Sequence, residues 1–198
     1  MPKAIAQTSA EAGTSQRLAA AAVELIAEQG WAAVTTRKVA SRAGVNPGLV
    51  HYHYGSVATL RREAALAAML AVFEPALAGL TSESDVDRAL ARAVAAIGEI
   101  DPHQPETIVS LEAMLQSQRD PELRDRLLSM LHEFRAALEE RIAGAVDAGR
   151  VRPDLDPHGA VLLVAAAMDG LGLHRAIDPD TSLAPAAAAL TTMLRQPA

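Results

Sequence analysis

Several helix starts are indicated by a short polar residue followed directly by proline, as at Asn46-Pro47, Asp120-Pro121 and Asp156-Pro157. The polar side chain can cap the free amide groups of a helix and proline fits the first helical turn, so each pair predicts a helix start. Runs that alternate apolar with polar residues, typical of strands, are missing, and aromatic residues make up 3% of the chain. We therefore expect an all-α fold.

Glycines mark the expected ends of several helices. Gly30, Gly44, Gly79 and Gly149 are predicted stops, because glycine readily adopts the left-handed conformation in which helices end. The sequence thus divides into about nine helices. We expect them at residues 15–29, 36–43, 47–54, 57–80, 84–100, 105–118, 121–148, 157–176 and 183–194.

Two of the longer helices carry further packing signals. Pro75 lies inside the helix at 57–80, where it removes a backbone hydrogen bond and predicts a kink near residues 71–75. In the helix at 121–148, apolar residues recur in steps of four and three and predict one buried stripe. The stripe consists of Leu123, Leu127, Leu131, Phe134, Leu138, Ile142 and Ala145.

Composition narrows the class of protein. The chain has 198 residues, half of them hydrophobic, which is enough to bury a substantial core. It has no cysteine, so disulfides, thiolate nucleophiles and cysteine metal ligands are excluded. The N-terminus lacks the apolar segment of a signal peptide, and the longest apolar runs, 64–73 and 160–168, are shorter than a bilayer requires. We expect a soluble cytoplasmic protein without a membrane partner.

The charge is unevenly distributed along the chain. Residues 1–62 hold seven Lys and Arg against three Glu, a net charge of +4, which leaves −10 for the remainder of a chain with a total of −6. A basic segment attached to an acidic body permits an oriented approach to a polyanion.

The most informative segment runs from Thr35 to Tyr54 and predicts two short helices around a tight turn. Thr36 can cap the first helix, Gly44 supplies the turn, and Asn46-Pro47 restarts the chain as a second helix at a steep angle. Such a second helix fits the major groove of B-form DNA, which is about 12 Å wide. The side chains expected to fill the small core are Val39, Ala40, Val45 and Val50.

Residues 17–60 resemble the TetR/AcrR family of bacterial transcription regulators. The family pattern has a glycine and an aromatic residue after the first helix, then a threonine, then Ala-x-x-Ala-Gly-Val, then a short helix rich in Tyr and His. This chain matches the pattern at Gly30-Trp31, Thr36, Ala40–Val45 and His51–Tyr54.

The resemblance implies roles for single residues in binding double-stranded operator DNA. Thr36 and His53 would contact phosphates, and Arg37 would read a base edge. For Tyr52 the alternative to a DNA contact is packing against the first helix. The residues that would face the groove are Pro47, Gly48, Leu49, His51 and Tyr52.

Two positions depart from the family pattern. The family usually has tyrosine at the position of His51 and lysine at the position of Val57, so one phosphate contact is expected to be missing. Arg61 and Arg62 either replace it as contacts to the DNA backbone or are solvated charges on a helix surface.

No catalytic or metal-binding pattern is found in the sequence. His51 and His53 are two residues apart, so on a helix they point to different faces, and no third ligand lies near them in the chain. The other histidines and the glycines match no hydrolase, phosphate-loop or dinucleotide motif. We expect no enzyme activity, no metal and no cofactor.

Small residues are frequent on the apolar faces of the last two expected helices. They allow another helix to approach closely, either from a second copy of the chain or from the same chain. The resemblance implies a homodimer through these helices, which suits two recognition helices about 34–36 Å apart on a pseudo-palindrome. The small residues are Gly159, Ala165, Ala166, Ala167, Gly170 and Gly172.

The helices between these regions are candidates to enclose a cavity for a small-molecule effector of unknown identity, which the resemblance implies. Methionine and phenylalanine at helical spacing are also typical of an ordinary core. The candidate lining residues are Met114, Leu115, Met130, Phe134 and Met168, with Gln118, Asp169, His174 or Arg175 as polar groups.

The expected organisation is a flexible arm at residues 1–14, a three-helix helix-turn-helix domain at 15–60, and a helical ligand-binding and dimerisation domain at 61–198. The leading function is a dimeric repressor that leaves its operator when a ligand binds. The alternative is a ligand- or partner-binding helical dimer whose N-terminal domain no longer binds DNA, in line with the missing lysine at Val57.

Overall fold

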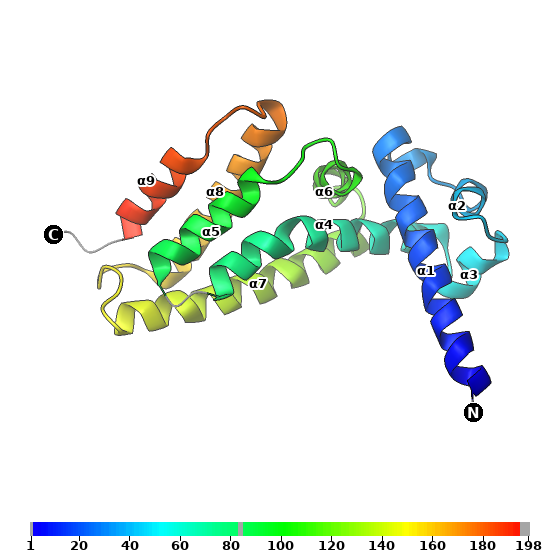
Figure 1. Ribbon diagram of the computed structural model, residues 1–198, viewed down its shortest axis with the longest axis horizontal. Coiled ribbons are helices and arrows are strands. Elements are labelled where there is room, and N and C mark those ends of the chain that lie inside the picture. Colours follow the sequence, from blue (N-terminus) through cyan, green and yellow to red (C-terminus); the bar gives the residue numbers. More distant parts are fainter. Residues whose placement is uncertain (1, 83–84, 195–198) are drawn as a thin grey trace. The chain divides into compact units, whose positions relative to one another are not determined.

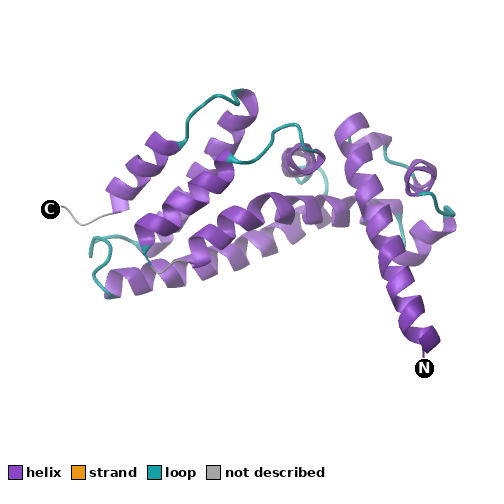
Figure 2. Ribbon diagram, in the orientation of Figure 1, coloured by secondary structure: helices purple, strands orange, loops and turns teal. Residues whose placement is uncertain are grey.

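The computed structural model describes residues 2–82 and 85–194, and every regular element in them is a helix (Figure 2). The expected all-α fold is confirmed, although the expected helix start at Ser84 lies outside the described residues. The elements labelled in Figure 1, with the short 3-10 helix η1, are α1 (Pro2–Gln29), η1 (Trp31–Ala33), α2 (Thr36–Ala43), α3 (Gly48–Tyr54), α4 (Val57–Ser82), α5 (Val86–Gly98), α6 (Pro105–Gln116), α7 (Pro121–Asp147), α8 (Pro157–Ile177) and α9 (Ala184–Leu194).

The chain forms two compact units. The first unit comprises residues 1–71 and 104–123, and the second comprises residues 72–103 and 124–198. Two of the three divisions, at 71–72 and 123–124, fall inside helices, so α4 and α7 each belong partly to one unit and partly to the other. The first unit is larger than the domain expected at 15–60, because it also takes in α6 and the following turn.

Asp120 and Asp156 cap helices as expected, whereas α3 begins at Gly48 with Pro47 at its N-cap, so Asn46 is not the cap of that helix. In each pair, the side-chain oxygen accepts a hydrogen bond from a backbone amide a few residues later. These bonds run from Gly48 N to Asn46 Oδ1 (2.8 Å), from Leu123 N to Asp120 Oδ1 (3.1 Å) and from Gly159 N to Asp156 Oδ2 (2.8 Å).

The N-terminal segment differs from the expected flexible arm, because α1 is helical from Pro2 onward. Residues 4–12 contain four alanines, the strongest helix former. Gly13 costs about 1 kcal/mol in a helix interior, which is too little to end a helix of this composition. The helix start expected at Ser15 is therefore wrong, because the polar residues there lie inside α1.

The expected helix stop at Gly79 is wrong, because α4 continues to Ser82. A Cβ atom at Gly79 would lie 2.9 Å from the backbone nitrogen of Ala93 and 3.1 Å from the carbonyl carbon of Arg92. Neither distance leaves room for a methyl group against a backbone. The glycine therefore permits a close approach of α4 to α5 within the second unit.

The first unit has a core to which α1, α2, α3, α4 and α6 contribute. Trp31, in η1 between α1 and α2, is also buried. The largest fully buried side chains of this unit include Leu18, Ile26, Val39, Val50, Leu60 and Val109.

The second unit has a separate core, in which α5 packs against α8 and α9 (Figure 1). Leu138 and Ile142 of α7 join Val94, Val161 and Val164 there. The predicted stripe of α7 is confirmed as mostly buried. Leu131 and Phe134 are half-buried. The buried members are Leu123, Leu127, Leu138, Ile142 and Ala145.

By length and composition alone, α4 and α8 could cross a membrane, with a mean hydropathy of 1.5 each. The longest uninterrupted apolar runs, 64–73 and 160–168, are nevertheless shorter than a bilayer requires. Alanine raises the mean hydropathy of both helices, and core helices of soluble proteins pass the same test. Both helices supply buried side chains to the compact units, such as Leu60 of α4 and Val161 of α8.

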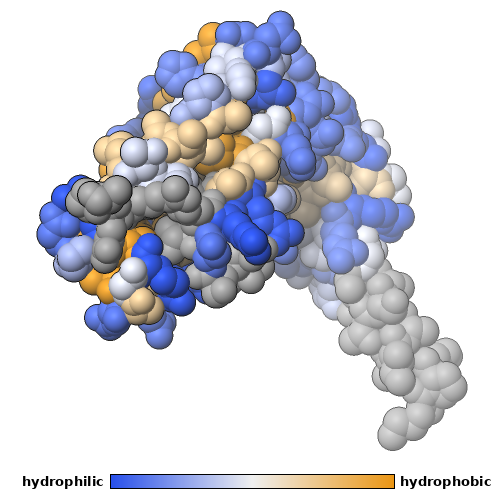
Figure 3. Space-filling model, turned by 60° about the vertical axis from the view of Figure 1, so that its left-hand side comes forward, coloured by the Kyte–Doolittle hydropathy of each residue, from blue (hydrophilic) through white to orange (hydrophobic). Residues whose placement is uncertain are grey.

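Part of the apolar surface is not covered by the fold. Figure 3 shows apolar atoms, in orange, exposed among hydrophilic ones. On α8 and α9 the exposed large apolar side chains are Leu162, Leu163, Leu173, Ile177 and Met193.

The close approach at Gly79 can be tested by adding one methyl group. Gly79→Ala is expected to lower the free energy of unfolding by about 1–3 kcal/mol, because α4 and α5 must move apart. Gly144→Ala in α7 is the matched control, since no atom lies within 4 Å of its Cβ position. The control is expected to raise stability by about 0.5–1 kcal/mol. Denaturant unfolding measures both, and equal stabilisation of the two variants would contradict the close approach.

Candidate nucleic-acid interface

The turn between α2 and α3 fixes how the two helices cross. Gly44 has a φ of 66°, in the left-handed region, and its amide bonds to the carbonyl oxygens at the end of α2. The amide of Val45 donates to the carbonyl of Ala40 at 2.9 Å. Val39, Ala40 and Val50 have no exposed surface, whereas Val45 is half-buried. The predicted helix-turn-helix geometry is present.

The cap of α2 is one residue earlier than expected. Thr35 has an extended backbone, with φ −124° and ψ 156°, and its side chain accepts a hydrogen bond from the amide of Lys38 at 3.4 Å. Thr36 already has helical geometry, so its predicted role as the cap is wrong.

Helix α3 is attached to α1 through Tyr54. The hydroxyl of Tyr54 donates to the carbonyl oxygen of Ser15 at 2.9 Å and accepts from its hydroxyl at 2.8 Å. Tyr54 is thus structural. Ser15 gave no signal in the sequence, because its partner is 39 residues away in the chain.

The opposite side of α3 faces solvent. Tyr52 has 68% of its surface exposed and lies edge to face with the ring of His53. His51 is exposed as well, and its Nδ1 lies 2.9 Å from the carbonyl oxygen of Gly55. Of the predicted DNA-binding residues, the exposed ones are Arg37, Pro47, Gly48, His51 and Tyr52, and the half-buried ones are Thr36, Leu49 and His53.

Most cations of this region already have partners. The Lys38 ammonium donates to Gln29 at 2.8 Å. Arg42 pairs with Glu28 at 2.6 Å and with Glu24 at 3.3 Å, and hydrogen bonds from its guanidinium lower the pKa of Glu28. Arg37, by contrast, is exposed, and no hydrogen bond or ion pair of its side chain is found within the described residues. It is therefore the cation of α2 that can bind an external anion or base.

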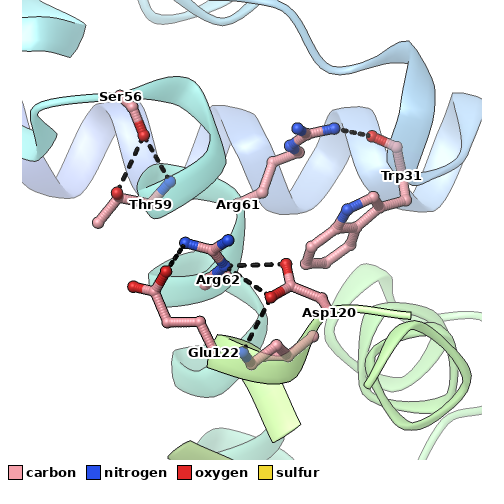
Figure 4. A network of polar contacts seen from close by, with 8 residues as sticks. Trp31, Ser56, Thr59, Arg61, Arg62, Asp120 and Glu122 are labelled. Atoms are coloured by element: carbon pink, nitrogen blue, oxygen red, sulfur yellow. Dashed lines mark hydrogen bonds and ion pairs between the residues drawn. The ribbon is translucent and has the colours of Figure 1, made fainter. Parts of the chain in front are cut away.

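Arg61 and Arg62 lie in a network behind the helix-turn-helix, within the first unit (Figure 4). Arg61 donates to the carbonyl oxygen of Trp31 at 3.1 Å, and its guanidinium lies 5.7 Å from the centre of the indole ring. Arg62 donates to Asp120 at 2.8 Å and pairs with Glu122. Both sequence interpretations, a DNA backbone contact or a solvated charge, are wrong, because internal acceptors hold these side chains.

The same network connects α6 and α7 to the first three helices. Glu112 of α6 accepts the amide of Trp31 at 2.7 Å. Burial opposes the ionisation of Asp120, but the hydrogen bonds from Arg62 and from the Leu123 amide outweigh it and lower the pKa of Asp120. Glu112 and Glu122 carried no sequence signal, whereas Asp120 was identified only as a helix cap.

The residues predicted to line a ligand cavity come from both units. Met114, Leu115 and Gln118 are exposed and belong to the first unit, whereas the others belong to the second. Met168 is buried in the core, with Phe134 partly buried beside it. Met130 is half-buried, and Asp169 and His174 are exposed. The predicted set stays a prediction.

A cleft in the second unit has a different lining. It lies between α5, the end of α8 and α9, and has a volume of about 780 Å³. Of the polar groups named from the sequence, Arg175 is the one that lines it. The other lining residues are mainly alanines and threonines, which carry no recognisable sequence signal for a ligand site.

The geometry defines the class of this protein as a helix-turn-helix regulator with a helical C-terminal part. Residues 18–64 match the family model for bacterial regulatory proteins of the tetR family. Residues 87–196 match the model for the C-terminal part of BetI-type transcriptional repressors. The chain belongs to the tetR family of bacterial regulatory proteins, with a C-terminal part of the BetI type. The resemblance seen in the sequence is confirmed, and this family consists of transcriptional regulators rather than enzymes.

Individual relatives agree with this assignment. The HTH-type transcriptional regulator BetI of Rhizobium meliloti is 31% identical over 186 residues, covering 86% of this chain and 82% of the relative. A solved structure described as a transcriptional regulator of Streptomyces coelicolor A3(2) has a TM-score of 0.69 and 28% identity, covering 92% of this chain and 99% of that chain. A regulator of Saccharomonospora viridis, solved in complex with choline, has a TM-score of 0.73 and 23% identity, covering 92% and 95%.

The ion pair of Asp120 predicts a pH-dependent stability. Asp120→Asn keeps an oxygen that can cap α7 but removes the charge opposite Arg62, so the free energy of unfolding at neutral pH is expected to fall by about 1–3 kcal/mol. The folded-state pKa of Asp120 is lowered, so its contribution is present above the unfolded pKa of about 3.9 and disappears as the pH falls through the folded value.

The difference between Asp120→Asn and the parent protein is therefore expected to shrink in acid. Urea unfolding at neutral and acidic pH measures it. Asp125→Asn is the control, since Asp125 is exposed and pairs only at 3.5 Å with its neighbour Arg124. A difference for Asp120→Asn that stays constant across the pH range would show that the ion pair does not stabilise the unit.

Proposed function

We propose that this protein is a ligand-responsive repressor that binds a pseudo-palindromic operator in duplex DNA as a homodimer. The proposal rests mainly on the exposure of the Arg37 guanidinium and on its lack of a partner within the described residues. Among the cations of the helix-turn-helix, Arg37 has an exposed guanidinium without a partner in the described residues, whereas Lys38 and Arg42 are held by internal acceptors.

The proposed DNA contacts follow from the exposed face of α2 and α3. Arg37 reads a base edge in the major groove, since its guanidinium matches the acceptors of guanine. Thr36 and His53 contact phosphates. The residues that approach the bases or the groove walls are Pro47, Gly48, Leu49, His51 and Tyr52.

The proposed dimer uses an exposed apolar stripe of α8. Leu162, Ala166, Leu173 and Ile177 follow one another in helical steps and are all exposed, Ile177 by 76%. Apart from the backbone of its own helix turn, no atom of the described residues lies within 4 Å of the Cβ position of Gly170. Packing within the chain therefore does not explain this glycine, which favours the approach of a second copy.

The proposed switch couples a ligand in the second unit to the operator on the first. A coupling free energy of about 1–3 kcal/mol weakens operator binding roughly 5- to 150-fold. The coupling path is α4, which runs through both units and contains Pro75 just after the division at residue 71. The choline complex of the Saccharomonospora regulator supports a ligand-binding role for this fold.

The alternative is a dimer whose helix-turn-helix no longer binds DNA. Val57 supports it, because the family usually has a lysine there, and Arg61 and Arg62 do not replace that lysine.

A gel shift with the DNA that flanks the gene separates the two functions. Specific binding that weakens steeply with salt supports the repressor, and no binding to any duplex at low ionic strength supports the alternative.

Arg37→Ala is expected to weaken operator binding roughly 10- to 100-fold while leaving binding to random DNA nearly unchanged, because a base contact is lost. Fluorescence anisotropy with operator and scrambled duplexes measures both affinities. Arg119→Ala is the control, since Arg119 is also an exposed arginine of the first unit but lies outside the helix-turn-helix. An equal loss on both duplexes would reject base reading by Arg37.

Ile177→Glu is expected to convert the dimer into a monomer, because a charge would be buried in an apolar interface. Analytical ultracentrifugation measures the change, and operator affinity should fall with it because one half-site alone binds weakly. Leu128→Glu on α7 is the matched control, since Leu128 is also an exposed large aliphatic residue of the second unit. A dimer that persists in Ile177→Glu would place the interface elsewhere.

A further inference from the structure

The cleft between α5, α8 and α9 is apolar apart from one charge. Alanines of α5 and α9, with Val94 and Leu183, form most of its wall. Three threonines add hydroxyl groups, and Arg175 is the one charged residue among the lining residues. A mostly apolar pocket with a few polar groups is the usual form of a small-molecule site.

Arg175 lies on the inward face of α8. Val164 and Met168 are buried on that face, and Arg175 follows Met168 by two helical turns. Its Nε is buried and has no hydrogen-bond partner. No ion pair of its guanidinium is found within the described residues. A buried donor without an acceptor costs free energy, so an absent acceptor is expected at this position.

The nearby carboxylate of Asp178 does not supply this acceptor. It accepts hydrogen bonds from the Thr181 hydroxyl at 2.6 Å and from the Asp180 amide at 3.2 Å. These bonds, with a smaller contribution from the charge of Arg175, lower the pKa of Asp178. Asp178 is therefore an ionised group committed to the loop after α8, and the guanidinium remains available to a ligand.

We propose that this cleft binds a monocarboxylate with an aliphatic body. The guanidinium of Arg175 pairs with the carboxylate, which accepts two parallel hydrogen bonds in the geometry that arginine favours. The aliphatic body lies along the alanines of α5 and α9. This inference rests on the proposed ligand response and names the chemical class of the effector.

A quaternary ammonium such as choline does not fit this cleft. Such cations are recognised by aromatic rings that surround them. The lining contains no aromatic residue, and beyond Tyr54 the whole chain has only Phe73 and Phe134. The positive charge of Arg175 would also repel a cationic ligand.

The proposed dimer leaves the cleft accessible. The residues of α9 that line it are Ala184, Ala187, Ala188, Thr191 and Thr192. An α-helix completes one turn every 3.6 residues, so Ala189 and Met193 lie on another face of α9, where they are exposed. A second copy that covers the outer face of α9 therefore does not need to fill the cleft.

Isothermal titration of the full-length protein with octanoate, without DNA, tests the proposal. Octanoate is expected to bind with a Kd on the order of 0.1 mM, and octyltrimethylammonium of the same chain length is expected to bind at least tenfold more weakly. Equal binding of the two compounds, or no binding of octanoate at about 1 mM, would overturn the proposal.

Arg175→Met keeps the length of the side chain and removes its charge, so octanoate is expected to bind roughly 10- to 100-fold more weakly. The variant also removes an unpaired buried donor, so its Tm should not fall. Ala188→Trp fills the cleft and should abolish binding with Arg175 intact, whereas Arg150→Met, at an exposed arginine of the same unit, should not change it. Unchanged binding in Arg175→Met or Ala188→Trp would refute this site.

A parallel titration with operator DNA separates this inference from the proposed function. If octanoate binds through Arg175 but does not release the operator, the site stands and the proposed switch fails. If the protein binds and releases its operator with other compounds while octanoate does not bind, the repressor stands and the monocarboxylate site is overturned.

Discussion

The surface that α3 presents depends on the turn at Gly44. The left-handed backbone there lets the chain reverse within a few residues, while the bond from Val45 N to Ala40 O holds the turn at 2.9 Å. Val39, Ala40 and Val50 are fully buried beneath it, so the angle between α2 and α3 is fixed by packing rather than by the loop alone. Tyr54 then attaches α3 to α1, which leaves Tyr52 and His51 directed toward solvent.

The charges of the first unit have two distinct uses. Arg42, Arg61 and Arg62 connect helices within the unit, because each has a carboxylate or a carbonyl oxygen as its partner. Arg37 has none within the described residues. A net positive charge counted from the sequence therefore overstates the number of cations available to DNA, and the exposed, unpaired ones are the relevant quantity for recognition.

The sequence predicted what depends on local chemistry and missed what depends on distant partners. The caps at Asp120 and Asp156 are local, so they located two helix starts correctly, and the Asn46-Pro47 pair located the start of α3 to within one residue. Gly79 was misread because its role depends on the backbone at Ala93, which lies in another helix. The acceptors of Arg61 and Arg62 and the alanine-lined cleft at Arg175 likewise exist only once the helices have packed, so no spacing in the chain could indicate them.

The absence of a loop at two of the crossings between the units has a mechanical consequence. α4 and α7 pass from one unit into the other without a loop, at residues 71–72 and 123–124. Pro75 removes one backbone hydrogen bond of α4 near its crossing, but the backbone there stays helical. A protease that needs an extended segment should therefore find no cleavage site at either crossing, and the two units should remain covalently joined under conditions that trim the chain ends.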